Sequence, residues 1–117
     1  MASPPSDFEF ERACACLEST GMKVLDRRWQ APGDQGEAGI IGLHRGMLIV
    51  CEVRIVTAAS GDGITRMSTA KIRRLRRIAV VWMDAHGTRY DRVRVDAIGI
   101  VREGPGGYTI THAVEVG

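Results

Sequence analysis

An apolar run that carries two charges constrains the fold of this chain most. Residues 47–56 read MLIVCEVRIV, with Glu52 and Arg54 as its charged side chains. Side chains alternate across a strand, so both charges share one face with Leu48 and Val50. Strands this apolar rarely carry charges unless these are paired, bound to a metal or at a sheet edge, because burying an unpaired charge is costly. The run therefore predicts either a functional site or an edge strand with a solvated Glu and Arg.

The preceding residues, 36–43, predict a second strand that is joined to the first through a tight Arg-Gly turn. Counting outward from this turn places Gly39 opposite Glu52 and Glu37 opposite Arg54, all on one face. Cross-strand partners have Cβ atoms about 4.5 to 5.5 Å apart, so two acids in these places can hold one hard cation. Here a glycine stands where one of the two acids is needed.

A basic helix is the second candidate binding feature. Ser68 or Thr69 is expected to cap a helix that runs to about His86, with Gly87 just beyond it. Its predicted buried stripe is Ile72, Leu75, Ala79 and Trp82. Five cations crowd its other sides, namely Lys71, Arg73, Arg74, Arg76 and Arg77. Arginine matches phosphate bidentately, and the release of counterions drives such binding, so these residues are predicted to contact nucleic acid; a solvated helix face is the alternative.

The remaining segments complete an α/β domain. Residues 1–5 are expected to form a disordered tail and residues 6–117 a single domain. A helix should begin at Ser6 or Asp7 and end at Gly21, followed by a strand over 22–29, a flexible loop over 57–67, and strands over 92–100 and 108–114. We therefore predict a mixed sheet of about five strands flanked by two helices.

The order of these parts resembles a known family. The elements that carry the resemblance are Arg27-Arg28-Trp29, Gly36-Glu37, Glu52-Val53-Arg54, the arginine-rich helix and Arg92-Val-Arg-Val-Asp96. From about Glu11 to Ile100 they resemble the YraN-like family of small bacterial proteins of uncertain function. The resemblance implies a restriction-endonuclease-like, PD-(D/E)xK fold that is similar to Holliday junction resolvases.

The chain departs from the family pattern at its site. That pattern is Gly-Glu-Ile-Asp-Leu followed by Glu-Val-Lys-Thr-Arg, whereas here Gly39 replaces the Asp, Arg54 the Lys and Val56 the last Arg. In the implied nuclease mechanism the Asp and the Glu hold Mg²⁺ and the Lys positions or deprotonates water. Glycine supplies no ligand, and arginine does not release its proton at working pH. The candidate catalytic residues Glu37, Glu52 and Arg54 therefore look like a nuclease remnant.

Three functions follow from this reading. The preferred one is a DNA-binding or other nucleic-acid-binding protein of nuclease-like fold with an inactive centre and no cofactor. The second is a Mg²⁺-dependent endonuclease or Holliday junction resolvase-like enzyme, with a ligand borrowed from Asp34 or Asp62, although acids in such loops are usually turn formers. The third is a protein-interaction module that presents its basic helix to an acidic partner. A homodimer is compatible with each of them.

Other side chains add little to the site. Asp96 matches an acid of the family pattern, but a salt bridge to Arg94 or another basic neighbour is preferred over catalysis. The three histidines lack ligand spacing, and the odd number of cysteines, three, argues against a disulfide framework. The chain of 117 residues with a net charge of +2 contains no apolar run near 18 residues and no secretory signal, so we expect a cytoplasmic protein that does not enter a membrane.

Overall fold

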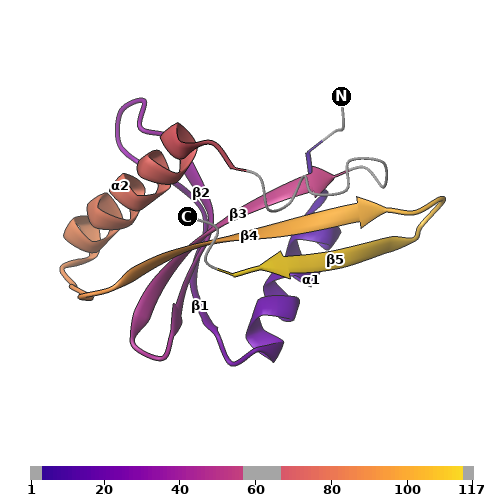
Figure 1. Cartoon of the computed structure of the whole chain (residues 1–117), viewed down its shortest axis with the longest axis horizontal. Helices are drawn as coiled ribbons and strands as arrows, with labels where there is room; N and C mark the ends of the chain where they lie inside the picture. Colours follow the sequence, from indigo (N-terminus) through magenta and orange to yellow (C-terminus); the bar gives the residue numbers. More distant parts are fainter. Residues whose placement is uncertain (1–3, 57–66, 115–117) are drawn as a thin grey trace.

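One mixed sheet with a helix packed on each face makes up the fold (Figure 1). The structure is a computed structural model and describes residues 4–56 and 67–114. Within these residues the elements are α1 (Asp7–Ser19), β1 (Lys23–Gln30), β2 (Glu37–His44), β3 (Met47–Val56), α2 (Thr69–His86), β4 (Val93–Arg102) and β5 (Tyr108–Ala113). The strands follow one another in sequence order, and β3 and β4 are parallel while the other neighbours are antiparallel. The predicted α/β fold with a five-stranded mixed sheet and two helices is confirmed.

Local signals place both helices. Ser6 caps α1 through a capping box, in which its hydroxyl accepts from the Glu9 backbone N–H and the Glu9 carboxylate accepts from the Ser6 N–H. Ser68 caps α2, and Gly87, with a φ of 63°, ends it in the left-handed region as predicted. The C-cap of α1 is Thr20, one residue before the glycine expected there.

Each face of the sheet has its own apolar core. Against α1 the sheet packs Ile40, Ile49, Cys51, Ile98 and Ile100, which meet Phe10, Ala13, Cys14 and Leu17 of the helix. Against α2 it packs Ala38, Ile41, Leu48, Val50 and Val95, which meet Leu75, Ile78, Ala79, Trp82 and Met83. The consecutive buried residues of β3 thus point alternately to the two cores, as the predicted alternation of side chains along this strand requires.

The sheet forks where the candidate site lies. The register of β2 and β3 runs from His44 opposite Met47 to Ile40 opposite Cys51, as the predicted turn requires, and goes no further. Beyond this point β2 stays paired with β1 through Glu37, while β3 stays paired with β4 through Val56. Figure 1 shows β2 and β3 diverging beyond the paired part. The expected pairs of Gly39 with Glu52 and of Glu37 with Arg54 are therefore not part of the β2–β3 ladder. In this region β2 remains hydrogen-bonded to β1, and β3 remains hydrogen-bonded to β4.

Two sequence predictions fall wholly or partly outside the described residues. The loop predicted over 57–67 is described only at Met67, and Asp62 lies outside the described part. Of the tail predicted over 1–5, the structure describes Pro4 and Pro5, whose backbone carbonyls accept from Arg102 and Arg28. In the part of the chain that the structure describes, neither helix has the length and apolarity to cross a membrane.

Candidate nucleic-acid interface

A pocket of about 390 Å³ opens at the fork between β2 and β3. We call it the fork pocket; its polar and charged lining consists of Arg28, Glu37, Glu52, Lys71 and Arg74. These residues come from β1, β2, β3 and the first turns of α2, so the divergence of the strands creates the space and α2 closes one side. Gly39 also lines the pocket. Two of the three predicted catalytic residues and two of the five predicted nucleic-acid-binding residues therefore meet there.

Lys71 connects the basic helix to the acid of β3. Its Nζ lies 2.5 Å from Oε2 of Glu52, and 16% of the Glu52 side chain is exposed against 36% of that of Lys71. The first turn of α2 contains no acidic residue, so Glu52 supplies the carboxylate that Lys71 contacts. A charge pair this sheltered from solvent is screened less than one at the open surface. The basic character of Lys71 was evident from the sequence, but its position beside Glu52 was not.

Glu37 has a different partner, and Arg54 lines a different pocket from Glu37. Oε2 of Glu37 accepts a hydrogen bond of 3.1 Å from Nε2 of Gln30, its neighbour across β1 and β2. Arg54 lines an adjacent pocket together with Met67 and Ser68, and Glu52 and Lys71 separate the two spaces by lining both. The structure thus brings Glu37 and Glu52 into one pocket and Glu52 and Arg54 into the next, so Glu37 and Arg54 do not share a pocket.

The cations of α2 divide into two groups. Arg73, Arg74 and Arg77 are exposed and have no ion-pair partner within the described residues. Arg76 is turned the other way, because its Nη1 donates a hydrogen bond of 3.1 Å to the carbonyl of Val93 at the start of β4. We therefore no longer expect Arg76 to contact phosphate. The sequence alone did not distinguish it from the other arginines of α2.

Arg74 lies beside Gly36, the residue that precedes β2. Gly36 has a φ of 104° and no side chain, and a Cβ built there would lie 3.5 Å from Nε of Arg74. The Arg74 side chain therefore lies next to the residue before Glu37, and the positive φ of Gly36 is what favours glycine there.

The residues present do not fit a metal centre. Within residues 4–56 and 67–114 no three His, Cys, Asp or Glu side chains are grouped so that they could hold a metal ion. In the fork pocket the Glu52 carboxylate is paired with Lys71, the Glu37 carboxylate is bonded to Gln30, and position 39 has no side chain. The described part of the fork pocket therefore lacks a ligand set for Mg²⁺.

A buried ion pair on β4 and two buried cysteines serve the fold. Arg94 donates two hydrogen bonds to the fully buried carboxylate of Asp96, and Nε2 of His112 lies 2.7 Å from the same carboxylate. The predicted salt bridge of Asp96 is thus confirmed. Burial raises the pKa of the Cys14 thiol and raises that of Cys51 further, which disfavours the reactive thiolate form in both.

Sequence reasoning missed the third cation of the fork pocket, Arg28. Its backbone has a φ of 46°, which is uncommon for a residue other than glycine. Arg27 pairs with Ile40 and Trp29 with Ala38, so Arg28 lies opposite Gly39. The basic Arg27-Arg28 dipeptide in a predicted strand was the available signal, but it did not show which of the two side chains would reach the site.

Known proteins that are similar to this chain agree on one family. The uncharacterised protein family UPF0102 matches residues 10–100. A UPF0102 protein of Arthrobacter sp. (strain FB24) is 33% identical over 108 residues, which cover 92% of this chain and 90% of that relative. UPF0102 proteins of Kineococcus radiotolerans and Streptomyces coelicolor are 33% and 32% identical, over 86% and 83% of this chain and 82% and 75% of the respective relatives. The YraN-like resemblance read from the motifs is thereby confirmed, and this chain belongs to the uncharacterised protein family UPF0102.

Proposed function

We propose that this protein binds nucleic acid, DNA in the first instance, through the exposed cations of α2 and the fork pocket. The observation that carries the proposal is the arrangement of Lys71, Arg73, Arg74 and Arg77. Three of them are exposed arginines without an ion-pair partner among the described residues, and Lys71 and Arg74 continue the positive surface into the pocket. Like charges at such spacing on a helix repel one another, so a row of phosphates is the partner that would stabilise them.

The proposed fold type is restriction-endonuclease-like. A mixed sheet with a parallel central pair, a helix on each face and two acids at a fork between central strands supports this assignment. The implied family pattern places its acids in the same two strands, at Glu37 and Glu52. We propose that the fold is used here to hold nucleic acid and not to cut it, because Gly39 and Arg54 lack the chemistry of the Asp and the Lys.

Salt-dependent binding tests the interface. Affinity for a duplex should fall steeply as salt rises, and Arg74→Ala combined with Arg77→Ala should lower the slope of log K against log salt by about 2, since each lost phosphate contact removes about 1. Arg89→Ala is a suitable control, because Arg89 is exposed, lies beyond the end of α2 and is paired with Asp84. The same loss of affinity in the control and the double variant, with both folded by circular dichroism, would refute the interface.

Two measurements would favour one of the other two functions over nucleic-acid binding. Cleavage of linear or branched DNA with Mg²⁺ or Mn²⁺ that co-purifies with the protein and is lost in Glu52→Ala would replace the proposal with an endonuclease or a Holliday junction resolvase-like enzyme. Binding to acidic proteins with no salt-dependent affinity for any DNA would replace it with the protein-interaction module. We expect neither cleavage that depends on Glu52 nor binding to acidic proteins in the absence of DNA binding.

A further inference from the structure

Arg28 occupies a position that breaks the alternation of β1. In a regular strand Arg27 and Trp29 would share a face. Instead, Nε of Arg27 lies 3.4 Å from Sγ of Cys14 on α1, whereas Trp29 packs against the α2 core. The left-handed backbone of Arg28 accounts for this change, because it sends both arginines to the α1 side. A non-glycine residue in this conformation is costly, and such strain is found where a side chain must be aimed.

The side chain of Arg28 is aimed at the rim of the fork pocket. Its guanidinium lies over the ring of Phe10, with Cζ 4.5 Å from the ring centroid, and both residues line the pocket. Stacking on an aromatic ring leaves the N–H groups at the edge of the guanidinium available to a planar or tetrahedral anion. Opposite Arg28, Gly39 has no side chain to occupy the space in front of it.

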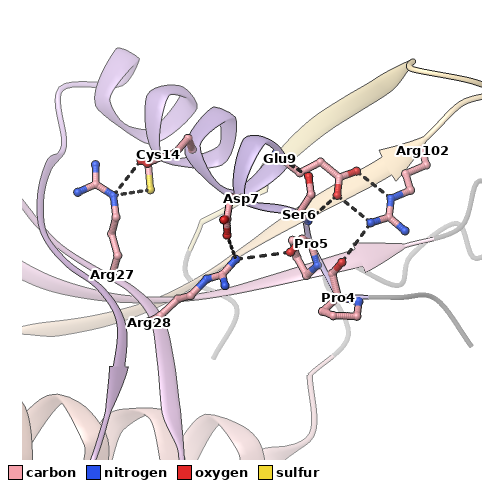
Figure 2. A network of polar contacts seen from close by, with 10 residues as sticks. Pro4, Pro5, Ser6, Asp7, Glu9, Cys14, Arg27, Arg28 and Arg102 are labelled. Carbon is pink, nitrogen blue, oxygen red and sulfur yellow. Dashed lines mark hydrogen bonds and ion pairs between the residues drawn. The ribbon is translucent and has the colours of Figure 1, made fainter.

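Among the described residues, the polar contacts of the Arg28 guanidinium are long. Figure 2 shows Nη2 of Arg28 directed at Asp7 and at the carbonyl of Pro5, at 3.7 and 3.5 Å. Of the Asp7 side chain 99% is exposed, so this ion pair is screened by water and readily exchanged. The neighbouring Arg102 is held differently, since its two bonds to the Glu9 carboxylate measure 2.8 and 2.7 Å.

We propose that Arg28 binds a phosphodiester group of the nucleic acid at the fork pocket, and that Asp7 occupies its guanidinium until that phosphate displaces the carboxylate. The inference rests on the proposed function and adds a subsite to it, on the side of the sheet that faces α1. Together with Lys71 and Arg74, Arg28 gives the pocket three cations against the two acids Glu37 and Glu52. The Glu9–Arg102 pair fixes the start of α1, so the Asp7 contact can open while the helix stays in place.

Arg28→Gly separates binding from folding. Glycine adopts a positive φ without penalty, so this variant should melt at the same temperature as the parent or higher, whereas alanine would retain the strain. Its affinity for duplex DNA at low salt should fall about five- to tenfold, and the log-log salt slope should fall by about 1. Arg45→Gly is a matched control, since Arg45 also has a positive φ, 51°, and is exposed in the turn between β2 and β3, away from the fork. The control should bind within about twofold of the parent, because it removes the same charge beyond a screening length from the pocket.

Asp7→Asn tests the competing carboxylate. Removing its charge should raise DNA affinity about two- to threefold in the parent, in line with a weak surface pair, and should have no effect in the Arg28→Gly background. An equal gain in both backgrounds would show that Asp7 acts only as a distant charge and would overturn its role. Equal affinities for Arg28→Gly and Arg45→Gly, in a protein whose binding still depends on Arg74 and Arg77, would overturn the subsite alone. A parent protein without salt-dependent binding would overturn the proposed function and the subsite together.

Discussion

Glu52 of β3 and Lys71 of α2 form an ion pair inside the fork pocket, so the acid that the sequence places on an apolar strand is neutralised by the first cation of the basic helix. The two residues are far apart in sequence and come together because α2 packs on the face of β3 that carries Glu52. This contact gives Glu52 a partner other than a metal ion and limits how freely Lys71 can meet a phosphate.

Glu52→Gln should therefore strengthen DNA binding. The substitution keeps the shape of the side chain, removes a negative charge from the pocket and releases Lys71, so the affinity should rise by about 0.5 to 1 kcal/mol, or about two- to fivefold. Fluorescence anisotropy with a labelled duplex at constant salt measures it. Glu103→Gln, at an exposed position beyond β4, is the control for the change in net charge. A weaker complex in Glu52→Gln alone would mean that the carboxylate itself serves the ligand.

Gly39→Asp should create a divalent-metal site, with Gly39→Asn as its matched control. A Cβ at residue 39 would lie 3.1 Å from the Cys51 carbonyl oxygen and 3.2 Å from Cγ2 of Val53, so both variants should lose about 1 kcal/mol of stability without metal. Only the aspartate adds a third carboxylate to the pocket that holds Glu37 and Glu52. With Mn²⁺ at about a hundred times its dissociation constant, the Asp variant should regain about 2.7 kcal/mol, seen as a rise in melting temperature. Equal Mn²⁺ responses of the Asp and Asn variants would show that residue 39 does not join the two acids.

The buried network on β4 should dominate the electrostatic contribution to stability. Arg94→Met removes the bidentate partner of the fully buried Asp96 and should lower the free energy of unfolding by about 3 kcal/mol, because the carboxylate then keeps His112 but loses its permanent cation. Urea denaturation followed by circular dichroism measures this loss. The same substitution at exposed Arg73 should change stability by less than about 0.5 kcal/mol. Similar small losses at both positions would contradict a buried network.

Glu9 should make stability depend on acid pH. The hydrogen bond from Arg102, followed by that from the Ser6 N–H, lowers the pKa of Glu9 from its ordinary 4.5 to about 2. A carboxyl with a depressed pKa stabilises the fold fully above the unfolded-state value, and this contribution is lost as pH falls from about 4.5 to about 2. The difference in unfolding free energy between the parent and Glu9→Gln should therefore be largest above pH 5 and shrink through this window. A constant difference down to pH 2 would show that Glu9 acts only as a neutral helix cap.

Much of the fold follows from short-range rules. Ser6, Ser68 and Gly87 mark helix ends because the groups that they satisfy lie within four residues of them. The Arg45-Gly46 turn sets the register of β2 against β3, since both residues adopt a positive φ and the pairing of His44 with Met47 follows directly. The alternation of residues 47–56 likewise predicts which residues of β3 face each helix.

The site depended on tertiary structure at three points. Where β2 and β3 separate, each strand has a competing partner on its other side, and no local pattern shows which pairing continues. Arg76 resembles the other arginines of α2 in sequence, but only the position of β4 supplies the Val93 carbonyl that it contacts. Arg28 takes its left-handed conformation opposite Gly39, a relationship between two strands that the sequence of either strand alone does not contain.

The sequence by itself therefore determined the elements, their caps, the hairpin register and the acids and cations available for a site. Only the tertiary structure decided that Glu52 meets Lys71, that Glu37 remains with Gln30 and that Arg28 joins the same pocket. The physical reason is the distance along the chain over which each interaction acts. Caps, turns and side-chain alternation are set by backbone geometry over a few residues, whereas the partner of a charged side chain is chosen among groups that the packing of the whole sheet and both helices brings within reach.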